Sequence, residues 1–233
     1  MLNRIKYFKY YSKLLIQNWR ETKSTYSQHG EDLLIELLLP KGVSTFIDIG
    51  ANDGVLFSNS FKFAKQGAQG ICIEPSKDSY RKLKLNHLFH RKVECIQAAI
   101  SDTNGFLFLQ EQGYEATLSE VSKERTGNAY KVSCFTLDRI LNLHPKFLKV
   151  DVLTVDVEGH EEEVFRGLSK IDFIAKLIIL ESDKTQIDNL LSIPSLRKYR
   201  ATYTNGLNTI LSHKSQTLPI HKKLPVGFQN VRS

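Results

Sequence analysis

The sequence is poor in the residues and runs that define several protein classes. It has three cysteines in 233 residues, Cys72, Cys95 and Cys134, and no C-x-x-C pair, which argues against a disulfide framework and predicts reduced, buried thiols. No apolar run approaches the length of a membrane span, and the first residues, which mix bases with aromatics, do not form a signal-peptide pattern. We therefore expect a soluble, cytoplasmic protein whose length suits one α/β domain with additions.

The phosphate-binding pattern G-x-G-x-x-G is absent as well. In its place, the strand-like run 45–49 leads into the turn Gly50-Ala51-Asn52-Asp53-Gly54, and the missing loop disfavours a dinucleotide and an NAD-dependent dehydrogenase. Gly50 and Gly54 still let the backbone pass close to a ligand at the end of a strand. A turn of this kind also occurs without any ligand, and that structural alternative stays open.

A carboxylate follows the second strand-like run. Residues 71–73 are apolar and Glu74 comes next, where an acid at the carboxyl end of a parallel strand can accept hydrogen bonds from both ribose hydroxyls. Asp48, two residues before Gly50, would repel a pyrophosphate and suits the cationic amino-acid part of S-adenosylmethionine. The two runs therefore predict an adenosine-type cofactor.

The third strand-like run, 93–101, ends in Ser101 and Asp102. In a doubly wound sheet these residues would face the same crevice and contact the adenine ring, with an ordinary Ser-Asp turn as the equal alternative. Residues 105–135 then interrupt the alternation of strands and helices with two strand-like runs around a polar loop. This pattern predicts a β-hairpin insertion near the active face, where loops usually choose the acceptor substrate.

A second group of ionisable residues follows the most buried-looking run, LKVDVLTV. Asp156, Glu158 and His160 stand at its carboxyl end, and ionisable groups gathered at that edge can bind a cationic ligand or move a proton. Helix capping accounts for the acids at 161–163, but it does not account for the two carboxylates on the strand end. His160 is a candidate general base in this position.

The net charge of +7 lies at the two ends of the chain. Residues 1–26 carry six basic and one acidic side chain, residues 197–233 carry seven basic and none acidic, and the middle holds 19 basic against 24 acidic. Basic ends contact anionic partners or are simply solvated. Residues 3–20 have the spacing of an amphipathic helix, which would rest on a membrane surface, on its own domain or on a second copy in a homodimer.

The last part of the chain predicts how the sheet closes. A hairpin signal around Asn205-Gly206 follows five strand–helix units and indicates an antiparallel closing pair. Residues 214–233 show little periodicity, and we expect a basic, irregular tail there. The chain is therefore divided into an N-terminal helix at 1–26, a domain at 27–213 and that tail.

Six separated motifs together resemble the FkbM family of S-adenosylmethionine-dependent methyltransferases. They are YSQHGEDLL, FIDIGANDG with SNS behind it, GICIEPS, AAISD, TLDRIL and LTVDVEGHEEEVFRG, in that order. The resemblance implies an α/β class I (Rossmann-like) methyltransferase fold with a seven-stranded, mostly parallel sheet, an antiparallel last strand and helices on both faces. It also implies S-adenosyl-L-methionine as the cofactor and O-methylation of a hydroxyl on a sugar, glycan or glycosylated natural product.

The resemblance also implies which residues hold the cofactor and the acceptor. Methyl transfer needs an acceptor hydroxyl in line with the methyl–sulfur bond and a group that removes its proton. We expect Asp156 by the methyl group and Glu158 or His160 as the proton acceptor. The implied contacts are Asp48, Gly50, Asn52 and Gly54 for the methionine and ribose, Glu74 for the ribose hydroxyls, Ser101 and Asp102 for the adenine side, and Ser58 and Asn59 from the family's Ser-Asn-Thr stretch, in which Ser60 replaces the threonine. Our own hypothesis is that Gln28, Glu31 and the insertion at 105–135 shape the sugar pocket.

Two other functions and one further cofactor remain open. An RNA methyltransferase would exploit the isoelectric point near 9.2, but the bases are terminal and no aromatic and basic recognition motif lies beside the pocket, so no nucleic-acid partner is expected. A catalytically silent binding module on the same fold would have no cofactor affinity. A divalent metal bound by Asp156, Glu158 and Glu181 is an alternative that we do not favour.

Overall fold

The computed structural model describes residues 16–17, 20, 22–112, 118–125, 127–181, 184–219 and 223–231, without the side chains of 111–112, 118–120 and 184–186. The helix predicted over residues 3–20 lies almost wholly outside these ranges. None of the described helices combines the length and the apolarity that crossing a bilayer requires.

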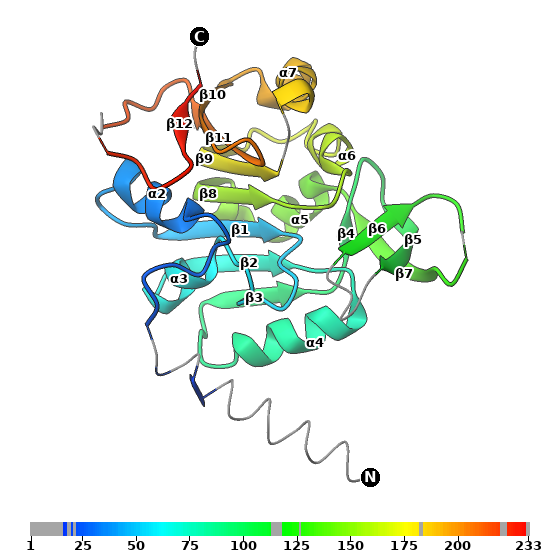
Figure 1. The fold of residues 1–233 in the computed structure, drawn as a ribbon. Helices are drawn as coiled ribbons and strands as arrows, with labels where there is room; N and C mark the ends of the chain where they lie inside the picture. The colour runs from blue at the N-terminus through cyan, green and yellow to red at the C-terminus, as the bar shows by residue number, and fades with distance from the viewer. Residues whose placement is uncertain are drawn as a thin grey trace.

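An eight-stranded sheet forms the centre of the described chain (Figure 1). Five strands are parallel, and β11 runs antiparallel to both of its neighbours, β9 and β10. This confirms an α/β fold with a mostly parallel sheet. The order across the sheet is β12 (Gln229–Asn230), β10 (Tyr199–Thr204), β11 (Asn208–His213), β9 (Ile174–Glu181), β8 (Lys149–Val155), β1 (Thr45–Ile49), β2 (Gln69–Ile73) and β3 (Val93–Ile96).

Helices cover both faces of this sheet because side chains alternate along buried strands. Ile47 and Ile71 face a core shared with α5 (Leu137–Leu143), α6 (Glu161–Arg166) and α7 (Lys184–Ser192). Phe46 and Cys72 face the other core, which is shared with α2 (Glu31–Leu38), α3 (Phe61–Lys65) and α4 (Lys77–Asn86). Two short 3-10 helices, Pro145–Phe147 and Pro194–Leu196, complete the described helices.

A second, four-stranded sheet stands beside the main one (Figure 1). Its order is β4 (Ala99–Ile100), β7 (Tyr130–Phe135), β5 (Gly105–Gln112) and β6 (Leu118–Ser122). The predicted hairpin is the antiparallel β5–β7 pair, whereas β6 forms within the stretch that was expected to be a polar loop. The expected single strand 93–101 is split, because β3 joins the main sheet and β4 joins the second one.

Two further segments differ from the expectation. The sequence after the glycine turn predicts a helix over 55–64, but the structure has only α3 there, because the Asp53 carboxylate accepts hydrogen bonds from the amides of Val55 and Leu56, both at 2.8 Å, and shapes a turn instead. The expected irregular tail contains Phe228, which is buried in the α2-side core, and β12, which pairs with β10. The tail therefore adds the eighth strand where seven were expected.

Candidate active site

A crevice lies at the carboxyl ends of β1, β2 and β8, the edge where ligands bind in doubly wound sheets. It brings the two stretches singled out in the sequence to the same place. The residues that line it are Ile49, Gly50, Asn52, Ile73, Glu74, Pro75, Ser79, Ala98, Ala99, Ile100, Val121, Asp156, Val157 and Glu158.

Gly50 occupies a position that admits no side chain. Its φ of 84° lies in the left-handed region, and a Cβ placed there would lie 1.7 Å from the carbonyl oxygen of Asp156. The amides of Gly50 and Ala51 both donate to the carbonyl oxygen of Ile73, at 2.9 and 3.1 Å. The turn after β1 is therefore drawn tightly between β2 and the loop after β8.

Gly54, predicted to contact the cofactor, has a different neighbourhood. A Cβ on this residue would lie 2.6 Å from Cδ1 of Leu83 and 3.0 Å from Nε2 of His87, both from the α4 side. Gly54 is not among the crevice-lining residues. Its glycine is needed for the close approach of the loop to α4.

Glu74 is held in place by backbone donors. Its Oε2 accepts a hydrogen bond from the amide of Asn52 at 2.9 Å, and its Oε1 accepts one from the amide of Ser76 at 2.8 Å. Asn52 has a left-handed φ of 48°, which directs its amide at Glu74. Backbone donors thus fix Glu74 at the carboxyl end of β2, the position from which we predicted contact with the ribose hydroxyls.

Asp48 lies beneath the crevice and is almost fully buried. Its Oδ2 accepts a hydrogen bond of 2.5 Å from the Ser60 hydroxyl. Burial raises the pKa of Asp48 to about 6, although the Ser60 hydroxyl acts in the opposite direction. Ser60, which departs from the family's threonine, thus supplies the hydroxyl that a threonine would supply.

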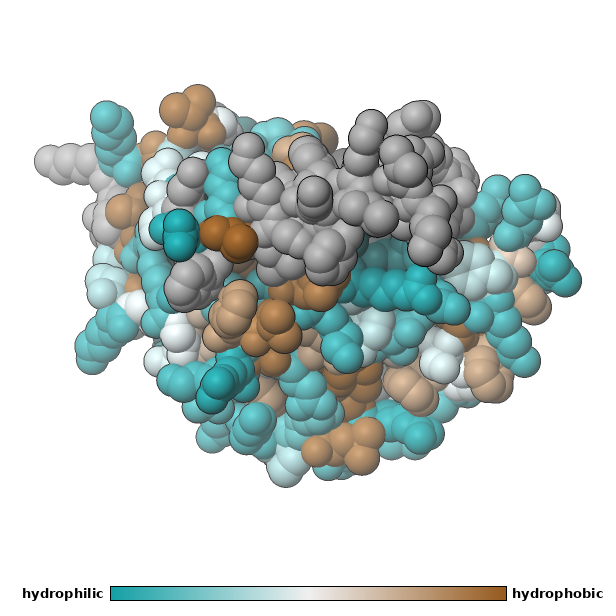
Figure 2. Space-filling model, turned by 90° about the horizontal axis from the view of Figure 1, so that it is seen from below, coloured by the Kyte–Doolittle hydropathy of each residue, from teal (hydrophilic) through white to brown (hydrophobic). Residues whose placement is uncertain are grey.

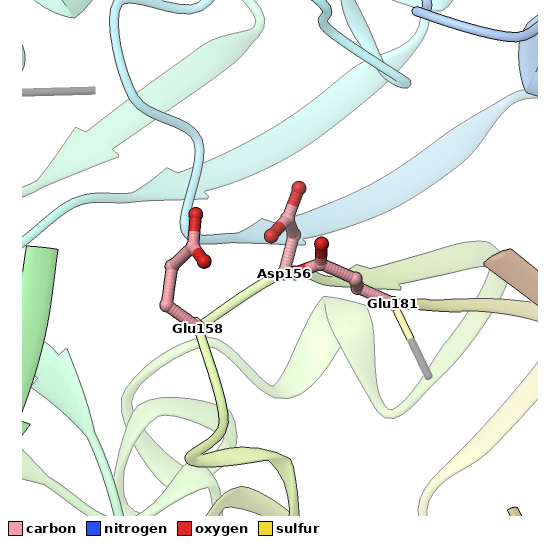
Figure 3. A group of neighbouring side chains, drawn as sticks. All are labelled: Asp156, Glu158 and Glu181. Atoms are coloured by element: carbon pink, nitrogen blue, oxygen red, sulfur yellow. The ribbon is translucent and has the colours of Figure 1, made fainter. Parts of the chain in front are cut away.

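Three carboxylates gather at the other side of the crevice (Figure 3). Asp156 and Glu158 follow β8 and Glu181 ends β9, and they offer oxygen atoms that all lie within 4.8 Å of one another. Asp156 is open to the crevice but has protein around most of its side chain, and this desolvation raises its pKa well above the usual range, with the neighbouring Glu181 as the next cause. A proton or a cation is therefore favoured among these oxygens.

The loop that carries these acids is shaped by Glu161. Its buried carboxylate accepts hydrogen bonds from the amides of Val157 and Gly159, both at 3.3 Å. Glu158, between them, has a left-handed φ of 54°. Glu161 therefore acts on the loop itself and not only as an acid at a helix start.

His160 points to a different set of partners. Its Nε2 lies 2.9 Å from Oγ of Ser101, and its Nδ1 lies 3.5 Å from Glu163. Burial lowers the pKa of His160, which favours the neutral ring. Ser101 is fully buried, Asp102 pairs with Lys123 at 3.6 Å, and none of His160, Ser101 and Asp102 lines the crevice.

Four other residues predicted for the site do not line the crevice. Ser58 Oγ accepts a hydrogen bond from the amide of Phe61, the first residue of α3, at 3.0 Å. The Asn59 side chain donates a hydrogen bond to Oγ1 of Thr154 at 3.3 Å and ties the loop to β8. Glu31 is fully buried, and Gln28 is exposed. The Glu31 carboxylate accepts hydrogen bonds from the side-chain amides of Asn205 and Asn208, at 3.1 and 2.7 Å. In the strand register, Asn208 of β11 stands opposite Glu181 of β9.

Several crevice residues were missed from the sequence. Ala98, Ala99 and Ile100 line the crevice in place of the expected Ser101 and Asp102. Val121 reaches it from β6, and Ser79 reaches it from α4. The run of small apolar residues before Ser101 was a usable signal for a flat ring, whereas nothing local in the sequence marked Val121.

The family model for the methyltransferase FkbM domain matches residues 48–201. This chain belongs to the FkbM methyltransferase family. The match begins at Asp48, spans both halves of the crevice and continues through β9 to β10. No curated protein sequence matches the chain.

Solved structures of other methyltransferases are similar to this chain at low identity. Methyltransferase FkbM from Methylobacillus flagellatus KT is 12% identical with a TM-score of 0.45, over 73% of this chain and 43% of that one. This chain thus spans less than half the length of that protein. An O-methyltransferase from Bacillus cereus in complex with SAH is 14% identical with a TM-score of 0.47, over 88% of this chain and 89% of that one.

Proposed function

We propose that this protein is an S-adenosylmethionine-dependent O-methyltransferase that acts on a hydroxyl of a sugar, a glycan or a glycosylated natural product. The observation that carries the proposal is the pairing of the glycine turn and Glu74 on one side of the crevice with Asp156 and Glu158 on the other. Membership of the FkbM family supports methyl transfer.

The residues present fit S-adenosylmethionine. The wall of Ile73, Ala98 to Ile100 and Val121 suits the faces of an adenine ring, and Glu74 suits the ribose hydroxyls. The carboxylates near Gly50 suit the cationic amino-acid part and the sulfonium. When bound, the cofactor would supply an activated methyl group.

The chain itself must then orient the acceptor and take up its proton. Glu158 lines the crevice on a loop that Glu161 holds, and we assign it the role of proton acceptor. Asp156, with its raised pKa, is assigned to the region of the transferred methyl group. His160 stays a candidate base from the sequence, but both of its ring nitrogens have neighbours away from the crevice, so we favour Glu158.

A glycan acceptor is favoured over RNA by the charge around the crevice. Among the described residues, those that line the crevice include the acids Glu74 and Glu158 and no lysine or arginine, so the lining offers no basic partner to a polyanion. The insertion and the exposed Gln28 remain the expected contacts of a sugar. A silent binding module on this fold is the remaining alternative, and it predicts no affinity for the cofactor.

One experiment separates these functions. Calorimetry with S-adenosylmethionine is compared for the wild type, Glu74→Gln and the control Asp78→Asn, which makes the same chemical change on an exposed part of α4. We expect wild-type binding, a loss of roughly tenfold or more in Glu74→Gln through weaker ribose contacts, and no change in the control. If S-adenosylmethionine does not bind to the wild type, the catalytically silent binding module becomes the favoured function.

The acceptor is tested with methyl-labelled cofactor. Purified protein is incubated with a panel of deoxy-sugar glycans and, separately, with RNA. Transfer of label to a glycan hydroxyl supports the proposal, and transfer to RNA alone would replace it with the RNA methyltransferase. If the cofactor binds but no sugar in the panel is labelled, the glycans of that panel are not acceptors, and the assignment of the cofactor site still holds.

A further inference from the structure

The surface where α4 ends and β3 begins has exposed apolar side chains that the proposed function does not use. Leu85, Leu88 and Phe89 have exposed fractions of 46%, 60% and 56%. Leu85 lies in the last turn of α4, and Leu88 and Phe89 lie in the turn that follows the helix. Large apolar side chains grouped in contact with water mark a site of interaction. We call residues 84–92 the α4 corner.

The same surface is strongly basic. The α4 corner itself carries three lysines and arginines and no acid, a net charge of +3, and residues 77–83 of α4 add three more bases and one aspartate. Burial lowers the pKa of His90, and it lowers the pKa of His87 to about 3, so neither histidine adds charge at neutral pH. The basic residues are Lys77, Arg81, Lys82, Lys84, Arg91 and Lys92.

The α4 corner continues into a shallow groove beside α3. Lys65, Phe89, Arg91 and Lys92 line it together with small residues of the α3–β2 turn. Figure 2 shows the molecule from the side on which α4 lies in Figure 1, and hydrophobic groups stand there among hydrophilic ones. Basic side chains around exposed apolar ones are complementary to a partner that has anionic groups at its surface and an apolar layer below them.

We propose that the α4 corner docks on an anionic lipid bilayer. Lysine and arginine heads would contact the lipid phosphates, and Leu85, Leu88 and Phe89 would enter the boundary between headgroups and acyl chains. A nucleic acid would explain the basic side chains equally well. It has no apolar partner for the two exposed leucines, however, because leucine cannot stack on nucleobases as an aromatic ring does. The bilayer is therefore the occupant that uses both kinds of side chain.

The position of the α4 corner is compatible with an active enzyme. α4 starts at Lys77, three residues after Glu74 in the crevice, and its ten residues carry the chain about 15 Å away from it. The α4 corner lies at the far end of that helix. Docking there would leave the crevice open, and it does not depend on which acceptor the enzyme uses.

The test is sedimentation of the full chain with phosphatidylcholine vesicles, with and without phosphatidylglycerol. The variant Lys84→Glu/Arg91→Glu is compared with the control Lys170→Glu/Arg200→Glu, which reverses one exposed lysine and one exposed arginine elsewhere. We expect binding only with phosphatidylglycerol, a loss on the order of thirtyfold or more in the α4 variant, and no comparable loss in the control. Leu88→Gln should weaken binding severalfold without changing the charge.

Other outcomes would overturn the assignment. Equal losses in the two charge variants would show a non-specific effect of net charge, and a loss confined to Lys6→Glu/Lys9→Glu would place the contact in the N-terminal segment. Binding of RNA, but not of vesicles, that is lost in the α4 variant would identify a nucleic-acid surface instead. Circular dichroism and affinity for S-adenosylmethionine show that each variant is folded.

Discussion

The carbonyl oxygen of Asp156 lies where a side chain on residue 50 would have to stand, 1.7 Å from the Cβ that Gly50 lacks. The loops after β1 and β8 are thereby packed backbone against backbone at the floor of the crevice. Any β-carbon at position 50 must push them apart, and a backbone carbonyl cannot rotate away as a flexible side chain can.

Gly50→Ala should therefore destabilise the protein more than a glycine substitution in open space. Gly67 is the matched control, because its φ of 90° is also left-handed but a Cβ there would meet nothing within 4 Å. We expect Gly67→Ala to cost about 1–2 kcal/mol from backbone strain, and Gly50→Ala to cost about 3–5 kcal/mol from strain plus the clash. Urea unfolding measures both, and equal losses would contradict the described contact.

Asp48 should make stability depend on pH. Its pKa is raised to about 6 in the folded protein, so its contribution is fully present below pH 4 and is lost as the pH rises through 6. Asp48→Asn stays neutral and still accepts the Ser60 hydrogen bond. The free energy of unfolding of the wild type relative to this variant should therefore fall by on the order of 2 kcal/mol between pH 4 and pH 7.

Denaturant titrations of both proteins at several pH values measure this difference. Asp78→Asn serves as the control, because Asp78 is exposed and pairs only with Arg81 in a surface ion pair. A wild-type curve that runs parallel to the Asp48→Asn curve would show that Asp48 titrates as it does in the unfolded chain.

Cofactor binding should not require a divalent metal. Burial and the neighbouring Glu181 raise the pKa of Asp156, and a proton held between the two carboxyl groups would relieve their repulsion without a cation. We expect a chelator to leave the affinity for S-adenosylmethionine unchanged. Added Mg²⁺ or Mn²⁺ that binds to the wild type in calorimetry, and no longer binds to Glu181→Gln, would instead establish a metal site.

Glu158 and His160 should differ in how their loss affects turnover. Once an acceptor is in hand, Glu158→Gln should lower kcat by about 100-fold or more, with little change in cofactor affinity, if it takes the proton. His160→Ala should act mainly through the contact with Ser101, giving a smaller loss and an unshifted pH profile. A pH profile that loses its acidic limb in His160→Ala would restore His160 as the base.

Helix caps, apolar runs and turn residues in the sequence predicted the elements whose bounds depend on neighbouring residues. The sequence TLDRILNLHP predicts a helix over 137–143, and α5 has these bounds. Thr136 accepts a capping hydrogen bond from the amide of Arg139 at its start, and His144-Pro145 follows its end. The position of Glu74 at a strand end was likewise visible from the apolar run before it. The predicted closing hairpin is the β10–β11 pair.

The rest depends on contacts between distant parts of the chain. Glu31 was expected in the sugar pocket, yet its partners Asn205 and Asn208 come from the other end of the sequence, and no local pattern connects them. The strand β12 forms because β10 would otherwise leave an edge unpaired, which the irregular sequence of the tail does not reveal. Gly54 looked like a ligand contact because the close approach of α4 is a tertiary feature.

The second sheet has a small core of its own, formed by Ala99, Leu107, Leu109, Val132 and Cys134, and it sends Val121 into the crevice. One wall of the site is therefore formed by a sheet other than the one that forms its floor. Exchanging residues 105–135 as a unit would therefore change the wall to which Val121 belongs and leave the backbone contact between Gly50 and Asp156 in place.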